Sequence, residues 1–141
     1  MEANPALIPV LTANRDRNGA RFAVMHGMAG GDGRFWPGGN IVAGSAHRPR
    51  GEELTVPVLD PGSIEAERGL RFGAHIMDIE GGEAEFIAAE ERRLARARFV
   101  LLELHADLIG AEACEGVRHR LSAAGQVRRG RVLNAKAWLR P

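Results

Sequence analysis

Two short apolar runs on either side of a stretch with helical periodicity constrain the fold of this chain most strongly. Residues 72–79 (FGAHIMDI) and 99–106 (FVLLELHA) have the length and composition of buried β-strands. Between them, residues 81–97 place Ile87 and Leu94 near one face of a helix. A strand–helix–strand unit predicts parallel strands joined by a right-handed crossover, in an α/β fold with helices on both faces of the sheet. The unbroken apolar start of the second run also predicts a strand buried on both faces.

Two further helices are predicted from their end signals. One begins at Asn4-Pro5, where Asn caps the helix and Pro fits its first turn, and it ends at Asn18-Gly19. The other covers residues 111–124 and ends at Gly125.

The remaining strands are predicted from shorter signals. They cover residues 21–28, about 41–43, 53–59, 126–129 and 131–139, the last two as a hairpin that turns at Arg129-Gly130. Residues 30–40 (GGDGRFWPGGN) form a glycine-rich loop anchored by Phe35 and Trp36, because the segment lacks GxxxxGK[ST] and does not lead from a strand directly into a helix.

Length, charge and cysteine content narrow the classes of protein. A chain of 141 residues, 45% of them hydrophobic, fits a single domain over residues 1–141 with a packed core. The 19 basic and 18 acidic residues nearly cancel, so neither a nucleic acid nor a membrane is an expected partner. No apolar run is long enough to cross a bilayer, and residues 1–10 do not resemble a secretory signal. Cys114, the single cysteine, suits a reducing, cytoplasmic location and an inert packing role.

Acidic side chains gather where the two strongest strands end. Asp78 and Glu80 follow the first run, and Glu103, His105 and Asp107 follow the second, each set on one side by period-two alternation. Since α/β sheets bind ligands at the carboxyl ends of their strands, neighbouring strands would bring these side chains to one rim. We expect Asp78 to be partly buried, and a buried carboxylate needs either a charged or hydrogen-bonding partner or a functional role.

Other interpretations of these side chains stay open. Glu83 fits the first turn of a helix, where a carboxylate favours the helix dipole, and Glu103 fits an ordinary rim carboxylate. A magnesium or manganese site built from Asp78, Glu103 and His105 is a second possibility, although the spacing of these residues is not diagnostic.

The other histidines are predicted to be structural. His26 and His75 lie within apolar runs and are expected in the core with backbone partners, whereas His47 and His119 are expected at the surface.

The two strand ends resemble a known family. MDIEGGEAEFI (77–87), followed by residues 98–125, resembles the FkbM-type methyltransferases. That family is marked by a strand ending Asp-hydrophobic-Glu-Gly-x-Glu, then a helix, then a strand ending Glu-x-His. The matching residues here are Asp78, Glu80, Gly81, Glu83, Glu103 and His105.

The resemblance implies an activity and a set of site residues. It implies methyl transfer from S-adenosylmethionine to a hydroxyl of a small molecule or sugar. Asp78 would orient the acceptor or act as general base, Glu103 and His105 would line the acceptor side, and Glu80 would contact the substrate. For the cofactor, the resemblance implies that Glu2 binds the ribose hydroxyls and that Met28 and Ala29 lie beside the adenine. It implies no resident metal ion.

The resemblance also implies that the domain is incomplete. The expected fold is a Rossmann-like methyltransferase sheet, incomplete at its N-terminal side, with a C-terminal β-hairpin. The family has an earlier strand and a GxGxG-type turn, whereas here Glu2 follows Met1. We therefore expect these 141 residues to bind S-adenosylmethionine weakly or not at all, and to self-associate through the unpaired edge of the strand at 72–79. The alternative function is that of a non-catalytic remnant, acting as a binding or assembly subunit.

Overall fold

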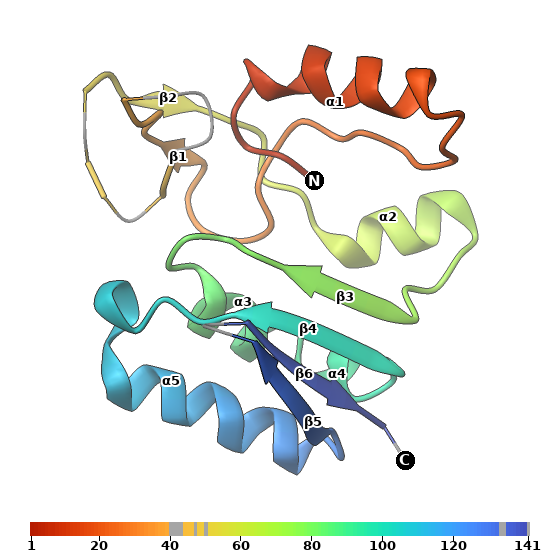
Figure 1. The fold of residues 1–141 in the computed structure, drawn as a ribbon, viewed down its shortest axis with the longest axis vertical. Coiled ribbons are helices and arrows are strands. Elements are labelled where there is room, and N and C mark those ends of the chain that lie inside the picture. The colour runs from red at the N-terminus through yellow and green to blue at the C-terminus, as the bar shows by residue number, and fades with distance from the viewer. Residues whose placement is uncertain (40–43, 47, 50, 133–134, 141) are drawn as a thin grey trace. The chain divides into compact units, whose positions relative to one another are not determined.

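The structure is a computed structural model that describes residues 1–141 except 40–43, 47, 50, 133–134 and 141 (Figure 1). The chain divides into two compact units, Met1–Pro61 and Gly62–Pro141. The predicted strand at 41–43 and the predicted surface residue His47 lie outside the described residues. None of the helices in the described part has the length and apolar character needed to cross a bilayer.

The first unit has little regular structure. It contains α1 (Leu7–Arg17) and two short antiparallel strands, β1 (Arg34–Phe35) and β2 (Leu54–Thr55). The helix begins two residues later than predicted, at Leu7, and its N-cap position is Ala6, without a side-chain cap. The buried Asn4 accepts a hydrogen bond from the Ala6 N–H through Oδ1 at 3.0 Å, in the turn that precedes the helix. The predicted loop anchor is confirmed for Phe35, whose ring is 5% exposed.

The predicted strands at 21–28 and 53–59 are wrong as continuous strands. Residues 21–28 make only isolated parallel bridges, from His26 to Glu2 and from Met28 to Val58. Ladder pairing stops there for a local reason: Gly27 has φ 142°, outside the β region of side-chain-bearing residues. Of residues 53–59, only β2 pairs as a strand.

The second unit is a mixed α/β structure. Its elements in chain order are α2 (Pro61–Arg68), β3 (Ala74–Met77), α3 (Glu83–Ala89), α4 (Glu91–Leu94), β4 (Phe99–Glu103), α5 (Ala106–Ala123), β5 (Val127–Val132) and β6 (Ala135–Leu139). The strands form one sheet in the order β3-β4-β6-β5. β3 and β4 are parallel, as predicted, and β6 is antiparallel to both β4 and β5.

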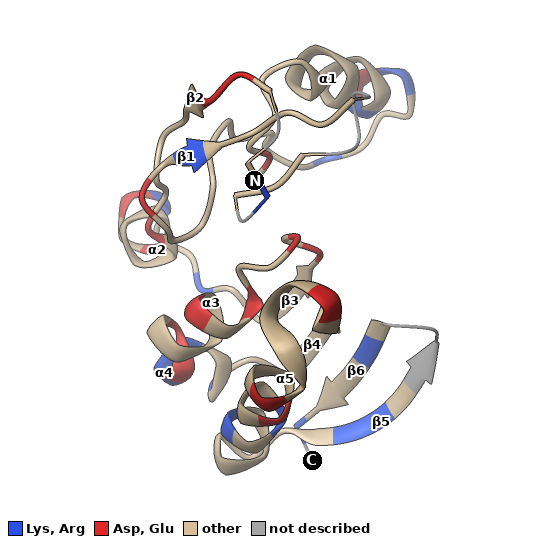
Figure 2. Cartoon of the chain, turned by 90° about the vertical axis from the view of Figure 1, so that its left-hand side faces the viewer, with Lys and Arg blue, Asp and Glu red and all other residues tan. Residues whose placement is uncertain are grey.

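One face of this sheet carries the core. Val100 and Leu102 of β4 are fully buried, and their partners across the sheet include Trp138, which is 1% exposed. Residues at the alternate positions are less buried, and Ile76 of β3 is 75% exposed. The helices α3, α4 and α5 lie on one side of the sheet (Figure 2). The prediction of a doubly buried β4 is therefore wrong, because the burial of its residues alternates.

Element boundaries differ from the predictions where backbone geometry intervenes. The predicted helix at 81–97 is divided at Glu90 into α3 and α4. α5 begins five residues before the predicted helix at 111, with a break at Gly110 (φ 82°, ψ 162°). The C-terminal hairpin is present, but Gly130 lies within β5 beside an irregularity in the strand pairing, so the predicted turn at Arg129-Gly130 is wrong. Helix α2 was not predicted at all.

Candidate functional site

The ends of β3 and β4 meet at one edge of the sheet, as the sequence predicted. The two strands are parallel, and Met77 pairs with Leu102 in the register. Both chains therefore leave the sheet at the same edge, β3 into the turn before α3 and β4 into the start of α5. This register brings side chains of residues 78–83 to His105.

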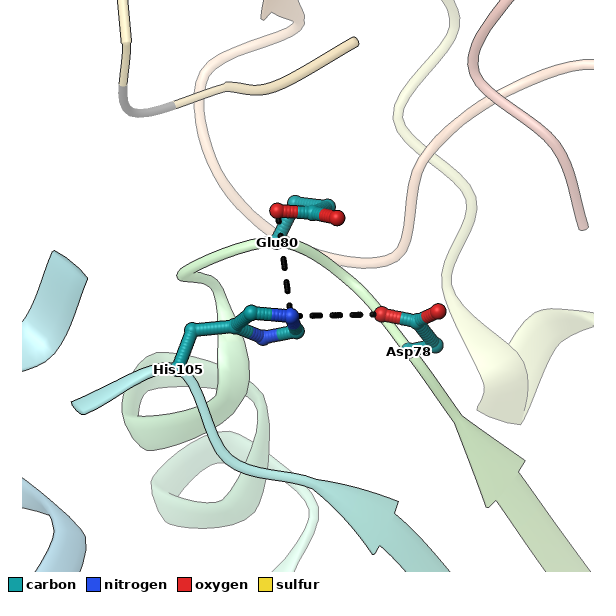
Figure 3. Close-up of side chains that lie close together, drawn as sticks. All are labelled: Asp78, Glu80 and His105. Carbon is teal, nitrogen blue, oxygen red and sulfur yellow. Dashed lines mark ion pairs between the residues drawn. The ribbon is translucent and has the colours of Figure 1, made fainter. Parts of the chain in front are cut away.

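His105 is the centre of a cluster with three carboxylates. Its Nδ1 lies 2.7 Å from Oε1 of Glu83, and its Nε2 lies 3.6 Å from Oδ1 of Asp78 and 3.8 Å from Oε2 of Glu80 (Figure 3). The imidazole is 12% exposed, whereas the Asp78 and Glu80 side chains are 61% and 47% exposed. The cluster thus has a buried side at Glu83 and an open side at the two other acids.

Glu83 forms the buried side of the cluster. It lies in the first turn of α3, and its side chain is 0% exposed. Oε1 accepts hydrogen bonds from the Gly81 N–H at 3.1 Å and from His105, whereas Oε2 has no hydrogen-bond partner among the described residues. The motif contained Glu83, but sequence reasoning assigned it only to the helix dipole and missed its contact with histidine.

A tight turn between β3 and α3 places these acids. Glu80 has φ 47°, and it is the one non-glycine residue in the described part of the chain with a positive φ. Gly81 follows with φ 108°, and the Gly82 N–H donates to the Ile79 carbonyl at 3.2 Å. A side chain in the left-handed region is uncommon and marks a constrained backbone. The turn therefore holds Glu80 beside His105 in an unfavourable local conformation.

The electrostatics of the cluster favour a protonated histidine. Burial alone lowers the pKa of His105, but the hydrogen bond to Glu83 and the negative charges of Glu83, Glu80 and Asp78 together raise it above its ordinary value. Because the Glu83 carboxylate only accepts hydrogen bonds, it holds a proton on Nδ1 whether the ring is neutral or charged. Nε2 is then the nitrogen that faces the open side.

Two predictions about the rim are corrected by this geometry. Asp78 is exposed rather than partly buried, because it follows the last residue of β3 and lies on the open side of the cluster. Glu103 is the last residue of β4, half-buried, and its carboxylate makes no hydrogen bond or ion pair with any described residue. Alternation ends with β4, so His105 and Asp107 do not continue the face that Glu103 begins; Asp107 lies in the first turn of α5.

The predicted cofactor-binding residues lie in the first unit. Glu2 is half-buried, its main chain bonds to Met25 and Gly27, and its Oε1 accepts from the Asn4 N–H at 2.7 Å. Met28, two residues after the bridge between Glu2 and His26, forms a bridge with Val58; Ala29 follows it, and both residues are half-buried. The structure thus places these three residues in one neighbourhood of Met1–Pro61.

The histidines outside the cluster are mostly as expected. The His26 Nε2 lies 3.2 Å from the Ala3 carbonyl, a backbone partner as predicted, but His26 is half-buried rather than in the core. His119 is exposed, as predicted. His75 departs from the prediction: its Nε2 is buried without a hydrogen-bond partner among the residues that the structure describes, and its ring packs edge-on against Phe72. Burial lowers the pKa of His75, with smaller opposing effects from nearby acids. Cys114 is a buried free thiol on α5, in agreement with a packing role.

None of the family models, curated proteins or solved structures compared with the chain matches it. The interpretation of the site therefore depends on its chemistry. A buried carboxylate that orients an imidazole, with two exposed carboxylates beside it, can accept a proton, orient a hydroxyl group or bind a cation.

Proposed function

We propose that the chain is an S-adenosylmethionine-dependent methyltransferase of FkbM type that methylates a hydroxyl group of a small molecule or sugar. One observation carries the proposal. The two segments on which the resemblance depends, Asp78–Glu83 and Glu103–His105, contribute to a single cluster in which His105 contacts Asp78, Glu80 and Glu83. The mixed sheet, with its parallel pair β3-β4 and its C-terminal hairpin β5-β6, is compatible with the resemblance.

The geometry supports a specific role for each side chain. Asp78 is exposed, so its carboxylate is available to accept the proton of an acceptor hydroxyl and to orient the oxygen toward the methyl group. S-adenosylmethionine, when bound, would supply the methyl group, and Asp78 would take up the hydroxyl proton of the acceptor. Glu80 would bind another polar group of the acceptor. His105, held by Glu83, would fix the position of both acids, and Glu103 stays a more distant candidate on the acceptor side.

The acceptor side is tested with a conservative variant. We expect Asp78→Asn to lower turnover with labelled S-adenosylmethionine by about a hundredfold, because a positioned acid or base typically contributes that much. Its affinity for the cofactor should not change. The control is Glu85→Gln, an exposed carboxylate on α3 outside the cluster. Equal turnover in Asp78→Asn and in the unchanged chain would remove Asp78 from the mechanism.

The cofactor side is tested by titration calorimetry. We expect a dissociation constant for S-adenosylmethionine of about 1 mM, which corresponds to a binding free energy of about −4 kcal/mol. Glu2→Gln should weaken binding further, whereas the control Glu52→Gln, at an exposed position, should not. Complete absence of binding at millimolar concentration would favour the alternative, a non-catalytic binding or assembly subunit. Low-micromolar binding would exclude that alternative.

A further inference from the structure

Three side chains at the open side of the cluster form a mixed set of metal-ligating atoms. Oδ1 or Oδ2 of Asp78, a carboxylate oxygen of Glu80 and a ring nitrogen of His105 all lie within 4.8 Å of one another. They come from two separate segments, the turn after β3 and the residue before α5, and they point toward one another in Figure 3. A nitrogen and two carboxylates together are a ligand set used by divalent metal ions.

The distances within this set suit an ion better than direct pairing. The Nε2 of His105 lies 3.6 Å from Asp78 and 3.8 Å from Glu80, beyond the ordinary range of N–H···O hydrogen bonds. Two ligands that each lie about 2.1 Å from one ion are about 3.0 Å apart at an octahedral angle and about 3.4 Å apart at a tetrahedral angle. The two separations from Nε2 are longer than these values by less than about 1 Å, so a small movement of the two acids, whose side chains are 61% and 47% exposed, would bring the three atoms to one ion.

Glu83 adds an observation from outside the ligand set. Ligating histidines almost always donate their second N–H to a carboxylate or carbonyl, which fixes the ring and its tautomer. Here the Glu83 Oε1 lies 2.7 Å from Nδ1, so the free lone pair of a neutral ring is on Nε2, facing Asp78 and Glu80. Glu83 itself is fully buried, with Oε2 unpaired among the described residues, an expensive arrangement unless positive charge lies nearby.

We propose that Asp78, Glu80 and His105 bind one divalent transition-metal ion of the Mn²⁺ class, with Glu83 as the positioning residue behind the histidine. The imidazole ligand favours a transition-metal ion over Mg²⁺, and the two carboxylates are ligands that suit Mn²⁺ among such ions. Three protein ligands leave coordination positions for water or for an oxygen of a substrate. This site does not depend on the proposed methyl transfer and gives Asp78 and Glu80 a different role, that of metal ligands, which metal binding tests directly.

The test is a titration of the protein with Mn²⁺, followed by the electron paramagnetic resonance signal of the free ion. We expect one Mn²⁺ per chain, and at least tenfold weaker binding in Asp78→Asn and Glu80→Gln, each of which removes the charge of one ligand and keeps its size. Glu83→Gln keeps an oxygen for Nδ1 and should weaken binding about 10–100-fold, as loss of such an outer partner does elsewhere. The control Glu85→Gln should bind as the unchanged chain does.

A second measurement identifies the nitrogen ligand without a variant of His105. In nuclear magnetic resonance spectra, substoichiometric Mn²⁺ should broaden the imidazole signals of His105 before those of His119, which lies far along α5. The proposal is overturned if no Mn²⁺ binds at 1 mM, the dissociation constant that corresponds to a binding free energy of about −4 kcal/mol. It is equally overturned if Asp78→Asn and Glu80→Gln bind Mn²⁺ like the control, or if His119 broadens first.

Discussion

Removing the imidazole of His105 should destabilise the protein because it leaves a buried carboxylate short of partners. Glu83 is 0% exposed, and its closest hydrogen bond, at 2.7 Å, is to His105. In His105→Ala only the Gly81 N–H, at 3.1 Å, still donates to Oε1, and Oε2 already has no partner among the described residues. The substitution therefore leaves the cost of burying the Glu83 charge uncompensated.

The size of the effect follows from the burial of the pair. Breaking a buried ion pair by removing one partner costs about 3–5 kcal/mol. His105 is 12% exposed, so water can reach the space left by the ring, and we expect the lower end, about 3 kcal/mol at neutral pH. That is a large part of the about 5–15 kcal/mol that stabilises an ordinary domain. Replacing the charge as well, in Glu83→Gln/His105→Ala, should recover about 2 kcal/mol relative to the sum of the single variants.

The free energy of unfolding is measured by urea denaturation in the presence of a chelator, with circular dichroism as the signal. His119→Ala is the matched control, because His119 is exposed on α5 and its loss should change the free energy of unfolding by less than about 0.5 kcal/mol. The Glu83–His105 pair is not the buried charge pair described above if His105→Ala lowers the free energy of unfolding no more than His119→Ala does. The same holds if the effect of the double variant equals the sum of the effects of the two single variants.

Other perturbations separate the remaining features of the second unit. Burial lowers the pKa of His75 below 6.5, so the contribution of the neutral ring to stability is present above pH 6.5 and is lost as the pH falls. His75→Phe should therefore reduce the loss of unfolding free energy at acid pH. The pKa of His105 is raised, so the pH dependence is opposite: its contribution to stability is present below pH 6.5 and is lost as the pH rises through the folded-state pKa. In metal-free buffer, His105→Gln should remove this decrease of the unfolding free energy with rising pH. Trp138→Ala should cost about 3–5 kcal/mol because the ring is 1% exposed, whereas Leu139→Ala, at 39% exposure, should cost much less, as urea denaturation would report. Ile76→Lys places a charge on β3, which pairs only with β4 among the described residues, and should reduce self-association in light scattering; a monomeric unchanged chain would contradict this prediction.

The pairing of β3 with β4 could be predicted because the signals for it are local. Each strand is an apolar run of the right length, and the helical stretch between them requires a crossover, which makes neighbouring strands parallel. Parallel neighbours end at the same edge, so the meeting of Asp78, Glu80 and His105 followed from strand order alone. The C-terminal hairpin was equally local, although its turn was misplaced because Gly130 is accommodated within β5.

The first unit could not be predicted in the same way. The apolar residues of 21–28 suggested a buried strand, but Phe22 is 51% exposed and only single bridges form. An apolar run becomes a strand only where a partner pairs with several successive residues, and here each partner segment offers one position. The two paired residues of β2 show the same limit. Hydrophobic content indicates burial, whereas pairing depends on segments distant in the sequence.

Burial divides the carboxylates of the cluster into two roles, and sequence periodicity assigned those roles to the wrong residues. Asp78 was expected to be the buried acid, yet it is 61% exposed, and Glu83, attributed to a helix dipole, is the buried one. This difference between the expected and the observed burial follows from the turn at Glu80. Its positive φ reverses the chain after β3, so that the start of α3, with Glu83, lies against His105. An exposed carboxylate can be reached by a ligand, whereas a buried one acts through the group that it holds. Substitutions at Asp78 should therefore change binding or turnover without unfolding the protein, and substitutions at Glu83 should change both stability and the orientation of His105.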